Sequence, residues 1–352
     1  MRGNNGYKSG MSAHAEILST IPQLRPLLAI GSQWLASRVL LAPMSGVTDV
    51  AMRRIARRFG AGMVVSEMVA SDDFAQGGAE AMLRADGAGI DQHVVQLAGC
   101  DPHWMNEAAR LAQGAGAHVI DINMGCPAKR VTGGAAGSAL MRDLDHAQRL
   151  IEATVAAVSI PVTLKMRLGW DHAAINAPEL ARRAENAGIA MVTVHGRTRQ
   201  QFYKGHADWA AIAAVKRAVT IPVVANGDCA SLADARAMLA ASGADAVMIG
   251  RAALGRPWLA GALGAALACG AALVQPPRAA QKAAALEHFE ALLGLFGREQ
   301  GLRHARKHLS AYASHAGANE ALRLALVTCE NAAAAMALLA LAFAGDDQEI
   351  AA

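Results

Sequence analysis

Eight short apolar runs alternate with amphipathic stretches between residues 38 and 258, and this alternation limits the possible fold more than any other feature of the chain. The runs are rich in Val, Ile, Met and Ala, as in strands that are buried on both faces of a parallel sheet. The expected strands are Val39–Ala42, Met63–Ser66, Val94–Leu97, His118–Ile122, Val162–Lys165, Met191–Val194, Val223–Ala225 and Ala246–Ile249. The expected helices are Thr48–Phe59, Pro102–Gln113, Asp145–Val158, Pro178–Ala187, Asp208–Ala218 and Ser231–Ala241.

Residues at the helix ends support this division. Asp101 is followed by proline, which fits an N-cap and a first helical position, and Ser231 begins a capping box. Gly116, Gly188 and Gly243 each follow Ala or Ser just before the next expected strand, where a glycine commonly ends a helix. We therefore expect eight strand–helix units.

Such units predict an α/β protein with a (β/α)8 TIM barrel. A doubly wound sheet is the competing architecture, and a glycine-rich dinucleotide fingerprint after the first strand would favour it. Leu41–Thr48, the stretch that follows the first strand, contains no such fingerprint. The pattern therefore favours the barrel.

The pattern changes after Trp258. Gly261–Gly270 is an alanine-rich helix, Val274–Pro277 is a linker, and the remainder is purely helical, which predicts a small all-α C-terminal domain. Met11 offers an alternative start, so the first residues fit a leader better than a structural element. The expected division is a partly disordered leader (1–30), a catalytic barrel (31–272) and a helical domain (278–345).

Composition restricts the setting in which the protein works. The five cysteines are scattered and form no CxxC pair, so we expect no disulfide framework, no metal site and a cytoplasmic location. The longest apolar run, 332–344, is short for a membrane span, and we expect a monomer without a membrane anchor. A net charge of +4 permits a polyanionic partner.

The helical domain carries a basic run, Arg298–Lys307, with three positive charges in excess of its one glutamate. A solvated helix face is the ordinary explanation for such a run. A contact with an RNA backbone is the more specific alternative, and the charge alone is weak support for it.

Polar side chains follow the ends of the expected strands, where barrel enzymes carry their chemistry. Glycines after the seventh and eighth strands, together with Arg251, predict a phosphate site. Taken singly, Cys126 could be a packed thiol and Lys165 an internal ion-pair partner. Taken together, the strand ends predict a polar pocket for a phosphorylated cofactor such as FMN, although the pattern does not distinguish a flavin from a sugar phosphate.

Longer motifs make a resemblance explicit. The chain resembles the tRNA-dihydrouridine synthases, especially their bacterial B-type branch, over about residues 38–325. The motifs that carry the resemblance are LAPMSGVTD (41–49), VSEM (65–68), QLAGCDP (96–102), DINMGCPAKRV (121–131), AGSALM (136–141), VTLKMRLGW (162–170), HGRTRQQFYKGHADW (195–209), IPVVANGD (221–228), MIGRAALGRPW (248–258) and RKHLSAY (306–312). Cys100 departs from the serine that is common in this family, at a position that we expect to be structural.

The resemblance implies an FMN-dependent oxidoreductase that uses NADPH to reduce a uridine of tRNA, with a D-loop position favoured. Cys126 would donate the proton, and Asn123 and Arg197 would contact the substrate. Arg306 and Lys307 would contact tRNA. The residues implied for FMN binding are Pro43, Met44, Ser45, Gln96, Lys165, His195, Asn226, Gly227, Asp228, Gly250 and Arg251.

Two other functions remain open at this point. One is a flavin barrel that acts on a free pyrimidine such as dihydroorotate, in which the basic helical domain would have no evident purpose. The other is a non-enzymatic RNA-binding protein, which the presence of Cys126 and Lys165 argues against. The sequence does not fix the target uridine, the preference for NADPH over NADH, the oligomeric state, or whether residues 1–10 belong to the native protein.

Overall fold

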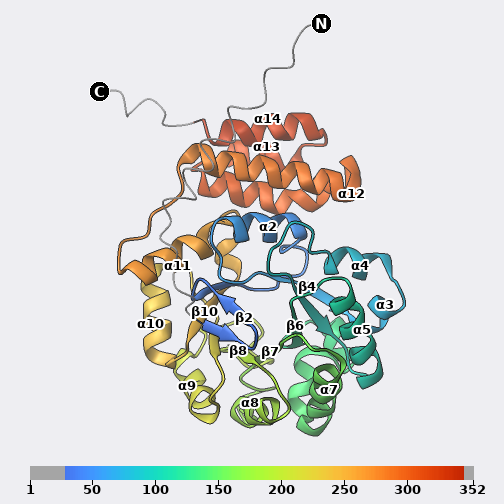
Figure 1. Cartoon of the computed structure of the whole chain (residues 1–352). Helices are drawn as coiled ribbons and strands as arrows, with labels where there is room; N and C mark the ends of the chain where they lie inside the picture. Colours follow the sequence, from blue (N-terminus) through green and yellow to red (C-terminus); the bar gives the residue numbers. More distant parts are fainter. Residues whose placement is uncertain (1–27, 345–352) are drawn as a thin grey trace, which may run out of the picture.

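The computed structural model describes residues 28–344, and its centre is a barrel of eight parallel strands (Figure 1). The ring closes between β3 and β4, where Leu41 pairs with Val64 and donates its amide hydrogen to the Met63 carbonyl at 2.9 Å. This arrangement confirms the expected barrel. Around the ring, the strands are β3 (Val39–Leu41), β10 (Ala246–Ile249), β9 (Val223–Asn226), β8 (Met191–His195), β7 (Val162–Arg167), β6 (Val119–Met124), β5 (Val94–Ala98) and β4 (Val65–Ala70).

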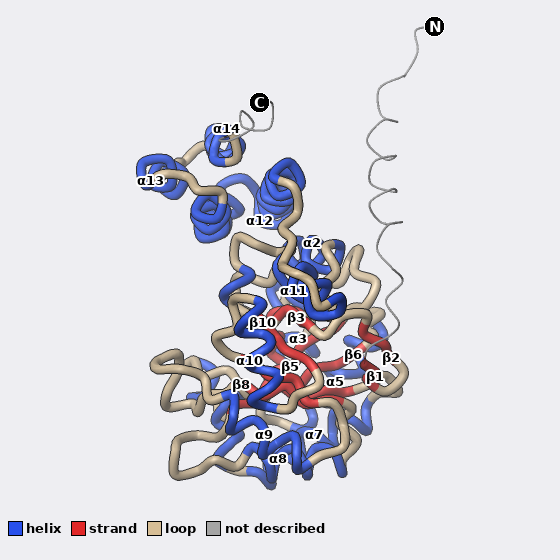
Figure 2. Tube along the Cα trace, turned by 90° about the vertical axis from the view of Figure 1, so that its left-hand side faces the viewer, coloured by secondary structure: helices blue, strands red, loops and turns tan. Residues whose placement is uncertain are grey.

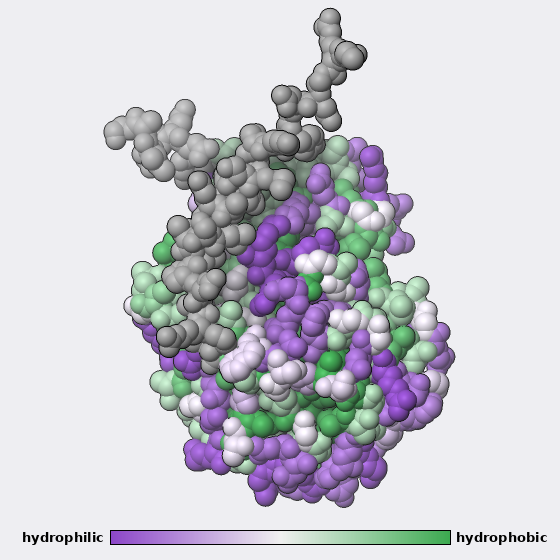
Figure 3. All heavy atoms as spheres, in the orientation of Figure 1, coloured by the Kyte–Doolittle hydropathy of each residue, from purple (hydrophilic) through white to green (hydrophobic). Residues whose placement is uncertain are grey.

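Helices surround the barrel as the sequence predicts. The six expected ones are α2 (Val50–Arg58), α5 (Pro102–Gly114), α7 (Leu144–Ala157), α8 (Ala177–Asn186), α9 (Trp209–Ala218) and α10 (Leu232–Ser242). Asp101 and Ser231 accept hydrogen bonds from the first turns of α5 and α10, and Gly116, Gly188 and Gly243 have positive φ angles after their helices. In the orientation of Figure 1, hydrophilic side chains gather along the lower edge, over α7, α8 and α9 (Figure 3).

Several short elements were not expected, because each is too short to show a helical or strand period. They are β1 (Leu28–Ile30), β2 (Gln33–Leu35), α3 (Ser71–Ala75), α4 (Ala79–Ala85), α6 (Lys129–Gly133) and the 3₁₀ helices η1 (Gly137–Arg142) and η2 (Arg251–Ala253).

The antiparallel hairpin of β1 and β2 closes one end of the barrel. Its Ile30 and Leu35 are fully buried against residues near the strand starts, such as Val65, Val119 and Val224. The opposite end, where the strands finish, is left to the functional loops. Residues 28–30 belong to the segment expected as a leader; the rest of that segment, Met11 included, lies outside the described residues.

A helical domain follows α11 (Leu259–Cys269) and a connection without regular structure that contains the expected linker. It consists of α12 (Arg278–His315), α13 (Glu320–Thr328) and α14 (Ala332–Ala342). Gly297, at φ 75° and ψ 167°, breaks α12 into two segments that pack closely at Gly301, where a Cβ would lie 2.5 Å from the Leu292 carbonyl oxygen. Within residues 28–344, no helix combines the length and the apolar character that a membrane crossing requires.

The helical domain packs over α2 at one edge of the barrel, on the side away from α7, α8 and α9 (Figures 1 and 2). Trp258, which is 2% exposed, lies in the shared core, with Phe59 at 6.1 Å and Tyr312 at 6.4 Å between ring centroids. Gly255 has φ +73°, and a Cβ there would come within 2.5 Å of the Ala311 backbone. The two domains are therefore joined by close apolar packing.

Candidate active site

A cavity of about 870 Å³ opens where the barrel strands end. A volume of this size suits a cofactor-sized ligand. Its lining includes every residue implied for FMN binding, as well as Asn123 and Cys126. The lining also includes residues that were not singled out, namely Met68, Arg84, Arg130, Val131, Phe202, Tyr203 and Met248. Two of them, Phe202 and Tyr203, belong to the HGRT motif and could have been found from it.

One wall of the cavity is a cradle of backbone amides after β9 and β10. Within the part of the chain that the structure describes, the amides of Gly227, Asp228, Gly250 and Arg251 donate to no protein acceptor. Gly227 has φ +124°, and a Cβ there would lie 2.7 Å from that of Ala207, so only glycine fits. Backbone amides without a protein acceptor, on residues that line the cavity beside an arginine, suit an anion such as phosphate.

The Asp228 carboxylate is compatible with an anion at this site, because it is paired with two arginines and a backbone amide. It accepts two hydrogen bonds from Arg197, at 2.6 and 2.9 Å, and one from the Ala207 amide at 2.8 Å, and it pairs with Arg251 at 3.2 Å. Burial would raise the pKa of Asp228, but these hydrogen bonds and cations bring it below its ordinary value.

Lys165 and His195 supply the cationic and neutral nitrogen groups of the site. Lys165 Nζ donates to Asn226 Oδ1 at 3.1 Å, and burial together with the Arg167 charge lowers the pKa of Lys165 to about 8. Burial and the surrounding cations hold the pKa of His195 well below its ordinary value, so its ring is neutral. Because Arg197 can only donate, His195 Nε2, 3.3 Å from it, accepts, and the proton is assigned to Nδ1.

A chain of hydrogen bonds inside the barrel fixes the loop that carries Cys126. Asp121 accepts from Gln96 Nε2 at 2.6 Å, and Gln96 Oε1 accepts from Asn123 Nδ2 at 2.7 Å. Asn123 Oδ1 then accepts from the amides of Gly125 and Cys126, at 3.1 and 2.9 Å. Burial raises the pKa of Asp121. Asp121 was not among the predicted site residues, although it precedes Asn123 by two positions in a strand and so shares its face.

The Cys126 loop is also held from outside the strand. The Cys126 carbonyl accepts from the amide and hydroxyl of Ser138, at 3.0 and 2.8 Å. Arg167 donates to the Gly125 carbonyl at 2.8 Å and, through another nitrogen, to the Phe202 carbonyl at 2.9 Å. Cys126 itself lines the cavity. The loop is therefore preorganised to present Cys126 to a ligand.

The predicted substrate residues do not all meet at the cavity. Arg197 is 1% exposed and absent from the lining, with its donors directed to Asp228 and to the carbonyls of Lys204 and Gly205. Its position suits a support for Asp228 better than a direct substrate contact. Arg306 and Lys307 lie on the second segment of α12, half-buried and exposed respectively, and Lys307 Nζ lies beside Gly46 of the β3–α2 loop.

The comparisons with known proteins decide the family. The family model described as Dihydrouridine synthase (Dus) matches residues 40–345. The chain belongs to the dihydrouridine synthase family. A probable tRNA-dihydrouridine synthase of Rhizobium leguminosarum bv. phaseoli is 57% identical over 276 residues, which cover 78% of this chain and 85% of that protein.

Two further relatives of this dihydrouridine synthase have the same kind of name. A probable tRNA-dihydrouridine synthase of Rhodobacter capsulatus is 51% identical over 90% of this chain and 98% of that protein. The tRNA-dihydrouridine synthase B of Xanthomonas campestris pv. campestris is 50% identical over 81% of this chain and 86% of that protein. These findings confirm the resemblance drawn from the sequence motifs.

Solved structures resemble this synthase in fold. A 2-naphthoyl-CoA reductase has a TM-score of 0.55 at 13% identity, covering 71% of this chain and 52% of its own. A morphinone reductase in complex with tetrahydroNAD has a TM-score of 0.52 at 15% identity, covering 74% and 93%. At such low identity, the likeness concerns the barrel fold alone.

The β3–α2 loop of the synthase, which lines the cavity, is fastened at several points. Thr48 Oγ1 accepts from the Met44 amide at 2.9 Å, and the Glu67 carboxylate accepts from the Gly46 amide. Burial raises the pKa of Glu67. Asp49 ends the loop and caps α2, accepting at 3.0 Å from each of the amides of Ala51 and Met52.

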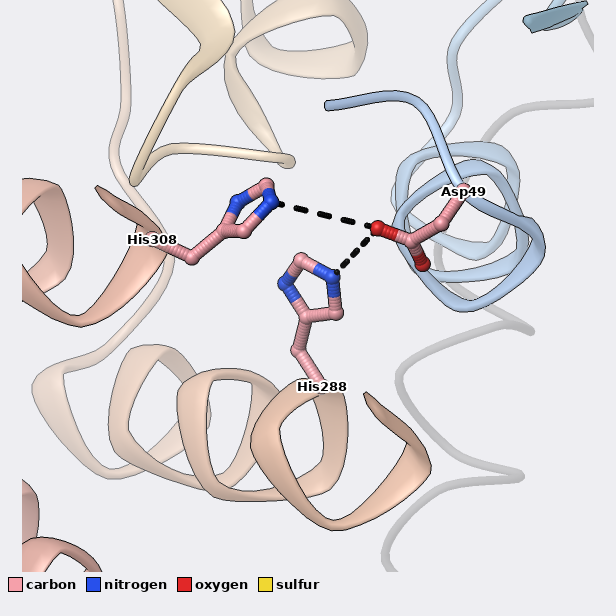
Figure 4. Close-up of side chains that lie close together, drawn as sticks. All are labelled: Asp49, His288 and His308. Carbon is pink, nitrogen blue, oxygen red and sulfur yellow. Dashed lines mark hydrogen bonds and ion pairs between the residues drawn. The ribbon is translucent and has the colours of Figure 1, made fainter. Parts of the chain in front are cut away.

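Asp49 also connects the barrel with the helical domain (Figure 4). Its Oδ2 lies 3.0 Å from His288 Nε2 and 3.9 Å from His308 Nε2, and His288 Nδ1 lies 3.0 Å from the Tyr312 hydroxyl. Burial would raise the pKa of Asp49, but the charge and hydrogen bond of His288 bring it below its ordinary value. Burial and His288 lower the pKa of His308 to about 3.

This interdomain cluster was not foreseen, because 239 residues separate Asp49 from His288 and no local pattern connects them. No metal was expected in this protein. Among the described residues, however, Asp49, His288 and His308 form one group whose potential ligand atoms lie within 4.8 Å of one another. The hydrogen bonds of Asp49 and His288 account for their burial without a metal ion.

Proposed function

We propose that this dihydrouridine synthase binds FMN in the cavity and uses NADPH to reduce a uridine of tRNA to 5,6-dihydrouridine, with Cys126 as the proton donor. The observation that carries the proposal is that Cys126 shares one cavity with a cradle of free amides. Membership of the family supports the substrate. It does not favour the free-pyrimidine alternative, in which the basic helical domain would be unexplained.

The chain's own groups fit a phosphorylated flavin. The free amides of Gly227, Asp228, Gly250 and Arg251, with the Arg251 guanidinium, would hold the phosphate. The main chain of Pro43–Ser45 and the side chains of Gln96 and Lys165 would contact the ring, with His195 beside them. A hydrogen-bond acceptor of the bound cofactor at Lys165 would stabilise the cationic form of the lysine and raise the pKa that burial lowers.

The reduced flavin, when bound, supplies a hydride to carbon 6 of the uracil. Cys126 would then protonate carbon 5, which completes the addition of two hydrogens across the double bond. Lys165 and Arg167 line the same cavity as Cys126, and their positive charges would offset the negative charge left on its sulfur. General acid catalysis of this kind is typically worth about 10²–10⁴-fold in rate.

Asn123 would position the base as well as the loop. Its carbonyl oxygen and one amide hydrogen are used within the protein, which leaves the second amide hydrogen to donate into the cavity. A uracil carbonyl is a suitable acceptor. The same side chain would thereby fix both the thiol loop and its target.

The target base must leave its stack to enter the cavity, at a cost of a few kcal/mol. Contacts with the rest of the RNA offset this cost. Lys307, at the β3–α2 loop, and Arg306 would contribute phosphate contacts from the helical domain. We infer a D-loop uridine from the B-type relative, and a reducing compartment such as the cytoplasm from the five free cysteines. A monomer remains our expectation.

Purified protein tests the proposal. We expect a yellow protein with a flavin absorption spectrum, which converts uridine to dihydrouridine in unmodified tRNA when NADPH is supplied. Cys126→Ala should keep the flavin and lose turnover by about 10²-fold or more. Equal activity in that variant, or turnover of dihydroorotate with none of tRNA, would refute the proposal.

A further inference from the structure

Trp170 lies between two arginines at the rim of the barrel. The guanidinium carbons of Arg142 and Arg199 lie over its ring, 4.8 and 4.9 Å from the ring centroid. Arg142 ends η1, Trp170 follows β7 and Arg199 follows β8. All three, called the Trp170 cluster below, therefore lie at the same end of the barrel as the active-site cavity.

Both arginines carry charge that no acid neutralises. Within residues 28–344, neither forms an ion pair or a side-chain hydrogen bond with another residue. Asp143 and Asp171, the acids next to the cluster in sequence, pair with neither arginine; Asp143 accepts from the His146 amide at 2.9 Å, and Asp171 accepts from the Ala173 and Ala174 amides at 3.0 Å. The guanidinium groups rest on the indole, and apart from Arg199 Nε, which is buried, their N–H groups are left for another partner.

The surrounding backbone holds the cluster in place. The amides of Arg199 and Gln200 donate to the carbonyls of Gly169 and Trp170, at 3.0 and 2.9 Å. Asn176 Nδ2 donates to the Met141 carbonyl at 2.7 Å, which fixes the end of η1 next to Arg142. Two cations on a fixed aromatic support are preorganised to bind an anion, because little side-chain entropy remains to be lost.

The position of the cluster suggests what that anion is. Arg142, Trp170 and Arg199 precede α7, α8 and α9 in the chain, and these three helices lie at the opposite edge of the barrel from α12, which carries Arg306 and Lys307 (Figure 1). The cavity opens between the two edges. A polyanion that extends across the mouth from the helical domain would reach the cluster.

We propose that the Trp170 cluster is a second anchor for tRNA, in which Arg142 and Arg199 bind backbone phosphates on the side of the mouth opposite the helical domain. This inference rests on the proposed function. Planar guanidinium groups match the oxygens of a phosphate in pairs. Two anchors on opposite edges would fix the direction of the RNA over the cavity, and so the base that reaches Cys126.

The test compares two double variants of the full-length, flavin-loaded protein. Arg142→Gln with Arg199→Gln removes the cluster's charge, and Arg110→Gln with Arg217→Gln removes two exposed charges from the C-terminal halves of α5 and α9, toward the other end of the barrel. Binding of tRNA is measured across salt concentrations. Loss of two phosphate contacts should reduce the slope of log K against log salt by about 1.4–1.8. We expect the cluster variant to show this, with KM for tRNA raised about tenfold and kcat changed less, and the control variant to match the native protein.

Equal salt slopes and equal KM values in the two variants would overturn the inference. So would a cluster variant that loses flavin or thermal stability while it binds tRNA with the native slope, because the cluster would then be structural. Failure of the proposed function has a separate signature, since a native protein that makes no dihydrouridine refutes the reaction whatever the tRNA-binding slopes are.

Discussion

Replacing Asp49 by alanine would measure how firmly the helical domain is fastened to the barrel. The carboxylate caps α2 through Oδ1 and accepts from His288 through Oδ2, at 3.0 Å in each contact. Loss of a cap costs about 0.5–2 kcal/mol. Removal of one partner from a buried charged pair costs about 3–5 kcal/mol. We therefore expect Asp49→Ala to lower the free energy of unfolding by roughly 3.5–7 kcal/mol, measured by urea titration with intrinsic fluorescence.

Two comparisons sharpen this prediction. Asp49→Asn keeps an oxygen for the cap but loses the charge, so it should cost only about 1.5–3 kcal/mol, as for a hydrogen bond to a charged group. Arg58→Ala breaks an ion pair with Glu287 across the same interface, and its partners are 45% and 41% exposed. That variant should cost at most about 1 kcal/mol. The reasoning is refuted if Asp49→Ala is no more damaging than Arg58→Ala.

Three further predictions follow from the geometry. Gly227→Ala should lower flavin occupancy at least about tenfold, because its φ is +124° and the added Cβ would clash with Ala207. Gly116→Ala is the control, since Gly116 has φ +92° with no neighbour within 4 Å, and it should keep the flavin. Equal flavin occupancy in the two variants would contradict the proposed phosphate site. His308 has a folded pKa of about 3 against 6.5 when unfolded, so the unfolded state binds more protons between these values. Stability should fall as pH drops below about 6.5, by at most roughly 1.4 kcal/mol per pH unit, and the native protein should lose more than a His308→Leu variant. Chelation with EDTA should leave the unfolding free energy unchanged, and a large loss would instead indicate a metal ion held by the interdomain cluster.

Local chemistry explains why the barrel could be predicted from the sequence. Each strand is a buried apolar run bounded by turn residues, and the helices carry recognisable caps, as at Asp101 and Ser231. The hairpin of β1 and β2 escaped prediction because its two strands have only three residues each and, unlike β3, precede the alternating strand–helix units. The break in α12 at Gly297 also escaped, since a lone glycine is tolerated within a helical pattern.

The site was predictable to the extent that strand ends define it. The cofactor residues, Asn123 and Cys126 all line the cavity because parallel strands end at one face. The sequence did not reveal which side chains pair with one another. Arg197 donates to Asp228 within the wall of the barrel, and His288 is hydrogen-bonded to Asp49, which lies 239 residues away in the sequence. Neither pairing produces a local sequence pattern.

Mass spectrometry of nuclease fragments of tRNA from a strain without this gene tests the central claim most directly, because the fragments keep each modified nucleoside at its position. We predict that dihydrouridine is lost at one position, that the native gene restores it, and that a gene encoding Cys126→Ala does not. Unchanged dihydrouridine after deletion of the gene, or full restoration by the Cys126→Ala variant, would contradict the account.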